Sequence, residues 1–110
     1  MFLTVDYSNP GQIEAFTRTG ALLWRYRPAG PQSLSHPSLA LPLSNGDVIA
    51  TDDANDRVIV VDPRTDRIVW QYGRRSLPGA TPGLLNGPDG LDLAPPNSDL
   101  MRHAATIGLP

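Results

Sequence analysis

The densest group of oxygen-bearing side chains lies in the segment TDDANDR, where Asp52, Asp53, Asn55 and Asp56 fall within five positions. Calcium takes six to eight oxygen ligands, so carboxylates and amides at this spacing suggest a calcium loop. The EF-hand pattern, however, requires glycine at the sixth position, where this chain has Arg57. The alternative is a tight turn whose Asp and Asn side chains accept hydrogen bonds from nearby backbone amides. We expect the turn, and we predict no metal site.

Ser35 and His36 raise the question of nucleophilic catalysis, because a serine beside a histidine base is found in many hydrolase sites. Catalytic pairing also needs a third group that orients the histidine, and it depends on positions in space. Neighbours in an extended chain point to opposite faces, which argues against a Ser35–His36 pair. We therefore predict no catalytic residue, and we expect His36 either to contact a ligand or to be structural or solvent-facing.

Four polar residues are candidate ligand contacts on one face of the protein. His36 precedes an expected strand in SLSHPSLA, and Asn86 and Asp89 occupy the equivalent place in GLLNGPDGLD. Asp53, from the acidic turn, completes the set. For each of these residues the alternative is an ordinary polar contact within a loop.

The elements that position these residues belong to a repeat of about 46 positions. Moving Asp6–Tyr26 forward by 46 places it on Asp52–Tyr72 without a gap, with seven identical residues in 21 positions. The identical pairs are Asp6/Asp52, Asn9/Asn55, Ile13/Ile59, Arg18/Arg64, Thr19/Thr65, Trp24/Trp70 and Tyr26/Tyr72. A second similarity links His36–Gly46 with Gly87–Ser98 at a larger offset. A period of this length, filled with short strands, is typical of β-propeller blades.

The sequence predicts an all-β protein made of two four-stranded antiparallel blades of a β-propeller, with an incomplete ring. Short apolar runs alternate with turn signals such as Asn45-Gly46, and Pro, Gly or Asp interrupts every window of helical spacing. The expected strands are Phe2–Val5, Ile13–Phe16, Leu22–Tyr26, Ser38–Leu43, Val48–Thr51, Val58–Val61, Arg67–Tyr72 and Gly90–Leu93.

Residues 1–96 form the expected repeat region, followed by an irregular tail at 97–110 that matches no strand template. The repeat region divides into a partial blade at 2–26, a full blade at 37–73 and the first strand of a third blade at 88–94. Such a chain is a fragment of a larger propeller and needs further blades to close the ring. These blades come either from missing chain or from other copies, with a trimer forming a six-bladed ring.

Four aromatic residues recur at equivalent positions, Trp24 and Tyr26 in the first repeat and Trp70 and Tyr72 in the second. An aromatic cage for a ligand is one interpretation. Their place in the repeat favours another, in which they pack one blade against the next. On this interpretation Trp70 is expected to be buried between sheets.

The segment Val61–Trp70 resembles the D-x-x-T-G-x-x-x-W repeat of quinoprotein (PQQ-like) propellers. Thr19–Trp24 matches the second half of that pattern, with Phe16 where the family usually has Asp, and DDANDRVIVVD is similar to NHL-type repeats. Together these motifs resemble the C-terminal third, about two blades, of uncharacterised six-bladed bacterial proteins. Quinoprotein dehydrogenases bind PQQ around a central channel and use a catalytic Asp with calcium. No residue of this chain maps onto a catalytic position of that family.

Composition argues against several classes of protein. The 110 residues have a formal net charge of -2, which provides no basic surface for nucleic acid or for a membrane. Cysteine is absent, so disulfide and thiolate chemistry are excluded. The N-terminus MFLTVDYSNPGQ lacks the basic region of a secretory signal, and no segment is long enough to cross a bilayer. We expect a soluble chain and predict no localisation.

Two classes of function remain. The first is a non-catalytic β-propeller scaffold or interaction module that binds no cofactor. The alternative is part of a quinoprotein-like, PQQ-dependent oxidoreductase or of a propeller hydrolase. The lack of a catalytic constellation and the small number of blades favour the first class, whereas fold similarity alone decides neither.

Overall fold

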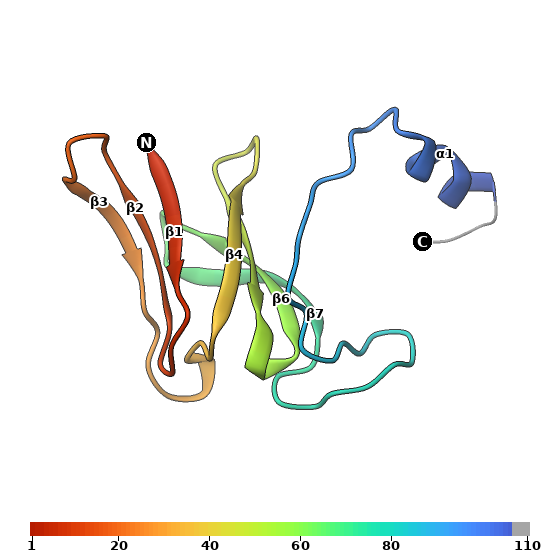
Figure 1. The fold of residues 1–110 in the computed structure, drawn as a ribbon, viewed down its shortest axis with the longest axis horizontal. Helices are drawn as coiled ribbons and strands as arrows, with labels where there is room; N and C mark the ends of the chain where they lie inside the picture. Colours follow the sequence, from red (N-terminus) through yellow and green to blue (C-terminus); the bar gives the residue numbers. More distant parts are fainter. Residues whose placement is uncertain (107–110) are drawn as a thin grey trace.

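The computed structural model describes residues 1–106, which form two antiparallel β-sheets standing side by side, a long loop and one helix (Figure 1). The first sheet has the strand order β1-β2-β3, and the second has the order β4-β5-β6-β7. The strands are β1 (Phe2–Asp6), β2 (Gln12–Phe16), β3 (Leu22–Tyr26), β4 (Pro37–Pro42), β5 (Val48–Asp52), β6 (Arg57–Asp62) and β7 (Arg67–Gly73). The expected all-β class is confirmed, with antiparallel sheets of three and four strands.

The strands follow the two-residue alternation of their side chains. In β2, Ile13 and Ala15 are buried, whereas the intervening Glu14 is only half-buried. Successive side chains of a strand point to opposite faces, so this pattern presents one apolar face to the second sheet. In β6 the residues from Ile59 to Val61 are all buried, because apolar side chains cover both faces of that strand.

The core lies between the two sheets. Its buried members come from both sheets and from the connection between them: Ile13, Tyr26, Leu34, Val48, Ala50, Ile59 and Val61. Five half-buried residues pack around this cluster: Leu3, Val5, Trp24, Ala40 and Ile68. Each fully buried aliphatic side chain contributes about 1.5–3 kcal/mol through the hydrophobic effect. The two sheets therefore stabilise each other through their facing sides.

The second sheet repeats the pairing of the first, with one shift in register. Ile13 pairs with Tyr26, and Val58 pairs with Tyr72. Tyr72 lies 46 positions after Tyr26, whereas Val58 lies only 45 positions after Ile13. The gap-free alignment, which set Ile59 against Ile13, is therefore wrong for this strand. Val58 is the structural counterpart of Ile13.

The shift arises from the loop that precedes the strand. Residues 7–11 join β1 to β2, and the shorter segment 53–56 joins β5 to β6. Because successive side chains of a strand alternate between its two faces, one residue fewer in the loop means that residues matched without a gap lie on opposite faces of their strands. The irregularities in strand pairing agree with this shift. One lies between Ala15 and Phe16 in β2, and the other lies 45 positions later, between Val60 and Val61 in β6.

The expected first strand of a third blade, residues 88–94, does not form a strand in the structure. A strand needs the backbone of a neighbouring strand to complete its hydrogen bonds. Pro88 has no N–H to donate, and within residues 1–106 no strand follows this segment to pair with it. The segment instead continues toward the helix at the C-terminal end (Figure 1).

The expected irregular tail contains a helix, α1 (Asp99–Thr106). The segment DLMRHAAT is rich in Leu, Met, Arg and Ala, which favour helices, and Asp99 in the first turn interacts favourably with the helix dipole. Arg102 pairs with Asp99 one turn earlier. The expectation that Pro, Gly or Asp interrupts every window of helical spacing is therefore wrong here, because residues 100–106 contain none of the three. Residues 107–110 of the expected tail lie outside the described residues. No helix among residues 1–106 is long and apolar enough to span a membrane.

Candidate functional site

Several loops meet at one end of the two sheets, at the bottom of the view in Figure 1. The backbone N–H of His36 donates a hydrogen bond to the carbonyl of Ser8 at 2.8 Å, which joins the β3–β4 connection to the β1–β2 loop. The N–H of Ala54 donates to the carbonyl of Ser35 at 3.0 Å, which adds the β5–β6 turn. The loops that carry His36 and Asp53 are therefore held in contact.

A buried ion pair lies beneath these loops. Arg57 Nε donates to Asp52 Oδ2 at 2.8 Å, and both side chains are only 1% exposed. Arg57 Nη1 donates to the side chains of Gln32 and Gln71, and Asn55 Nδ2 donates to Asp52 Oδ2. A buried ion pair is stable only when its remaining donors and acceptors are also hydrogen-bonded. This network meets that condition, so its role is to hold the loops together. Sequence reasoning did not identify it.

The first sheet has a smaller, exposed version of this network. Gln12 Nε2 donates to Asp6 Oδ2 at 2.6 Å, and Gln12 pairs with Asp6 as Arg57 pairs with Asp52. Gln12 precedes Arg57 by 45 positions, which agrees with the corrected alignment of β2 with β6. The shared position of the two interactions supports the structural repeat.

The acidic run forms a tight turn. Residues Asp53–Asn55 form a 3₁₀ turn, and Asp56 follows with a left-handed backbone at φ 58°. The side chains diverge: Asp52 joins the buried ion pair, Asp53 lines a surface pocket, and Asp56 Oδ1 accepts from the N–H of Gly87 at 3.0 Å. Among residues 1–106, no three His, Cys, Asp or Glu side chains are placed to hold a metal ion.

A shallow surface pocket of about 360 Å³, here named the loop pocket, opens among the connecting segments. Its lining residues are Tyr7, His36, Asp53, Ala54, Gly87 and Asp89. Three of the four predicted ligand contacts therefore line one pocket. Asn86 does not line it, although its neighbour Gly87 does. The structure thus brings together residues that are up to 82 positions apart, from Tyr7 to Asp89.

Asp53 is the buried acid of the loop pocket, at 7% exposure. Ser38 Oγ donates to Asp53 Oδ1 at 2.8 Å. Burial raises the pKa of Asp53 above its ordinary value, and the neighbouring carboxylate of Asp89 raises it further, while hydrogen bonds from Ser38 and Thr51 oppose the change. The carboxylate of Asp89 therefore disfavours ionisation of the buried Asp53.

His36 contributes an aromatic ring to the loop pocket. Its ring meets that of Tyr7 edge to face, with ring centroids 4.8 Å apart. Ser35 Oγ lies 3.2 Å from His36 Nδ1, so the expectation that these neighbours point apart is wrong. His36 has φ 53°, and the alternation of an extended chain does not apply to a left-handed residue. No hydrogen bond or ion pair in the described structure joins a third, orienting group to the His36 ring.

The backbone of His36 has a counterpart in the next connection. His36 has φ 53° and precedes Pro37, and Gly87 has φ 56° and precedes Pro88. Glycine adopts this conformation at no steric cost, whereas histidine adopts it only when its surroundings enforce it. The match extends the repeat to the β3–β4 connection, where the sequence similarity between His36–Gly46 and Gly87–Ser98 indicated it.

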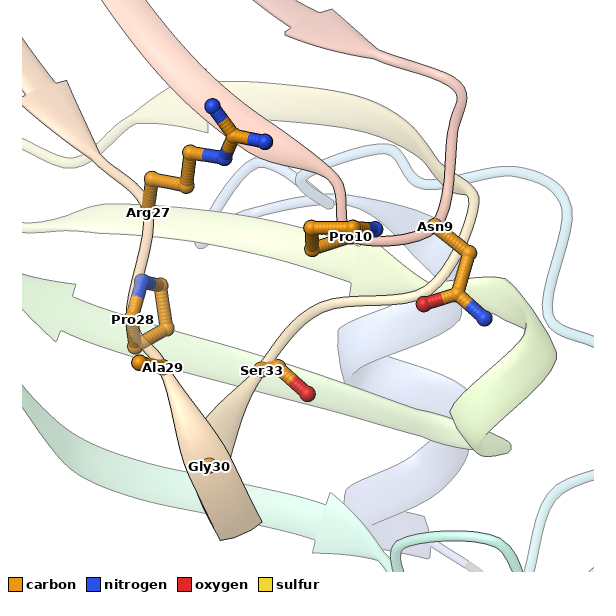
Figure 2. A pocket seen from close by; sticks show the side chains of 7 residues that line it. All are labelled: Asn9, Pro10, Arg27, Pro28, Ala29, Gly30 and Ser33. Atoms are coloured by element: carbon orange, nitrogen blue, oxygen red, sulfur yellow. The ribbon is translucent and has the colours of Figure 1, made fainter.

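A second hollow of about 370 Å³ lies beside the β3–β4 connection (Figure 2). It is lined by Asn9, Pro10, Arg27, Pro28, Ala29, Gly30 and Ser33. Figure 2 shows Arg27 and Pro10 on facing sides of this hollow. It contains one charged side chain and none of the predicted ligand contacts, so it is a weaker candidate than the loop pocket.

In each sheet the recurrent Trp and Tyr stack on each other, with nearly the same geometry. Trp24 stacks on Tyr26 with ring centroids 6.1 Å apart and an interplanar angle of 20°, and Trp70 stacks on Tyr72 at 6.4 Å and 21°. Trp24 Nε1 also donates to Asp66 Oδ1 in the β6–β7 turn at 2.7 Å, which ties the first sheet to the second.

The two pairs differ in burial. Tyr26 is 4% exposed, whereas Tyr72 is 42% and Trp70 is 50% exposed. The expectation that Trp70 is buried between sheets is therefore wrong. Within residues 1–106, no third sheet covers β7.

No family model, no curated protein and no solved structure matches the chain.

Proposed function

We propose that this chain is a non-catalytic β-propeller scaffold, in which each sheet is a blade and the second blade binds a further one. One observation carries the proposal. Each sheet presents a stacked Trp–Tyr pair from its last strand, and the second sheet covers the pair of the first. The equivalent pair, Trp70 and Tyr72, stays half exposed. In a stack of repeats each unit covers the one before it, so the last unit needs a partner.

The surface offered to that partner is apolar, and we name it the open face. The strand pairings place Ile49, Val58 and Val60 on the same side of the second sheet as Trp70 and Tyr72. This side is opposite to the one that carries the shared core. Trp70 and Tyr72 are exposed on this side, beside the half-buried Ile49 and Val58 and the buried Val60. Exposed aromatic surface of this kind is typical of an interaction site.

The contact between the first and the second sheet indicates which kind of sheet fits the open face. Trp24 Nε1 donates to Asp66, and the buried Ile59 of the second sheet faces the first. A second copy packed head to tail, as in a trimer, would offer Gly20 in place of Asp66 and Glu14 in place of Ile59. A blade with an Asp in the turn before its last strand, and an aliphatic residue in the strand that precedes this turn, is therefore a better match than a copy.

Sedimentation equilibrium of the purified chain at micromolar concentration tests the proposal. We expect self-association or poor solubility, because the open face exposes aromatic surface to water. Trp70→Asp should shift the chain to monomer, since a charge is costly to bury against another sheet. Tyr7→Asp changes an aromatic residue that is 67% exposed outside the open face, and it should leave association unchanged.

A discrete trimer would assign the partner to a second copy of the chain. A wild-type chain that behaves as a cooperatively unfolding monomer, with no effect of Trp70→Asp, would contradict the scaffold proposal.

PQQ and calcium have no part in this proposal. PQQ is an anionic cofactor with several carboxylates, and the loop pocket already holds the acids Asp53 and Asp89. These residues do not fit such a group, because like charges repel in a partly buried site. Titration with PQQ plus Ca²⁺ should leave the fluorescence of Trp24 and Trp70 unchanged. Saturable quenching would instead support the oxidoreductase alternative.

A further inference from the structure

The loop pocket holds acidic groups that its protein contacts do not neutralise. Asp53 is 7% exposed, and its hydrogen-bond donors are the neutral hydroxyls of Ser38 and Thr51. The charged group that shifts its pKa is another carboxylate, that of Asp89, rather than an arginine. By contrast, the buried Asp52 is paired with Arg57 at 2.8 Å. A buried carboxylate without a cation is costly, so this pocket favours a positively charged ligand.

One wall of the loop pocket is aromatic. The Tyr7 ring meets the His36 ring edge to face at 4.8 Å, and Tyr7 is 67% exposed. The Tyr7 ring is thus accessible beside two carboxyl groups. A planar cation can stack on an aromatic ring while its N–H groups donate to carboxylates. Guanidinium combines these two properties, whereas an ammonium group is a compact point charge without a flat face.

We propose that the loop pocket binds a guanidinium group, with Asp53 and Asp89 as acceptors and Tyr7 as the stacking surface. The group belongs either to an arginine side chain of a partner protein or to a small guanidine compound. A divalent metal ion is a poorer match, because within residues 1–106 no three ligating side chains converge. This proposal does not depend on the scaffold function, since the loop pocket and the open face share no residue.

Calorimetric titration with N-acetylarginine amide tests the proposal, with the citrulline analogue as a neutral control of similar shape. We expect saturable binding of the arginine compound and none of the citrulline compound. Asp89→Asn should weaken binding at least about tenfold, because it removes an exposed acceptor charge without disturbing the core. Asp92→Asn changes a nearby exposed acid outside the pocket and should leave affinity unchanged.

Equal binding of the citrulline compound, or full affinity in Asp89→Asn, would overturn the proposal. Tyr7→Ala adds a second measurement, with an expected several-fold loss from the missing stacking surface. Comparison of agmatine with an arginine-containing tripeptide identifies the source of the group. Equal affinities assign a small compound, and tighter peptide binding assigns a protein partner. The same titrations in Trp70→Asp should give unchanged affinity, whatever the outcome for the scaffold proposal.

Discussion

The two sheets carry the same local pattern in different surroundings. In the first sheet, Asp6 and Gln12 form an exposed hydrogen bond, whereas in the second, Asp52 and Arg57 form an ion pair that is 1% exposed. The aromatic pairs show the reverse: the pair of β3 is covered and the pair of β7 is open. The repeat therefore determines which side chains meet within a sheet, and the neighbouring sheet determines which of these contacts are buried and stabilising.

The largest expected difference concerns the two polar pairs. Arg57→Ala leaves the buried Asp52 carboxylate unpaired and should lower the free energy of unfolding by about 3–5 kcal/mol. The matched change Gln12→Ala removes an exposed contact and should cost less than about 0.5 kcal/mol. Urea denaturation followed by circular dichroism measures both values. Similar costs for the two variants would show that the surroundings do not control these pairs.

The second prediction uses the two tyrosines. Tyr26 is 4% exposed within the core, so Tyr26→Ala should cost about 3 kcal/mol through lost burial and a cavity. Tyr72 is 42% exposed, and Tyr72→Ala should cost about 1 kcal/mol or less in the chain alone. Thermal unfolding measures both. If a partner that covers the open face is added, the cost of Tyr72→Ala should rise toward that of Tyr26→Ala.

The third prediction concerns the turn that precedes the last strand of each sheet. Asp66→Gly gives the β6–β7 turn the residue found at Gly20, and both positions have positive φ. The change removes the hydrogen bond from Trp24 Nε1, so we expect a loss of about 1 kcal/mol, partly offset because glycine tolerates this backbone. A double-mutant cycle with Trp24→Phe isolates the bond. Additive effects in that cycle would mean that the bond contributes no stability.

The smallest effect concerns Asp53, whose counterpart in the first sheet is the non-acidic Tyr7. Burial and Asp89 raise the pKa of Asp53, so the folded state holds this proton more tightly than the unfolded state. Asp53 therefore contributes to the free energy of unfolding at pH values below its pKa in the unfolded state. This contribution is lost as the pH rises through its pKa in the folded state. Asp53→Asn should therefore be at least as stable as wild type at pH 7, with the difference closing in acid. Denaturation midpoints between pH 3 and pH 7 measure this, and a growing advantage of Asp53→Asn toward low pH contradicts it.

Sequence reasoning predicted the seven strands of the two sheets because short apolar runs separated by Gly, Pro and Asn turns report local backbone preferences. It missed the register shift at β6, because Ile13 and Ile59 are identical and a gap-free alignment cannot detect one missing loop residue. It also missed α1, because the expectation that Pro, Gly or Asp interrupts every window of helical spacing is wrong for residues 100–106. It placed a strand at 88–94, where the described chain offers no partner.

Three of the four residues predicted to contact a ligand lie together in the structure. His36 and Asp89 were selected from their places in the repeat and Asp53 from the acidic turn, and the structure gathers all three in the loop pocket. Asn86 was selected on the same basis, but it lies just outside the lining. The contact between Ser35 and His36 depends on a positive φ, which the sequence signals only weakly when the residue is not glycine.

The one-residue difference between the β1–β2 loop and the β5–β6 turn has a consequence for building proteins from these repeats. In a chimera that crosses from one repeat to the other within β1 and β5, or within β3 and β7, residues 46 positions apart replace each other. Each side chain then keeps its inward or outward direction. A crossover that joins β6 to β2 by their gap-free match instead exchanges those sides, so that in the first sheet Glu14 would take the inward place of Ala15. Modular recombination of this protein therefore has permitted and forbidden junctions, and the length of one surface loop sets them.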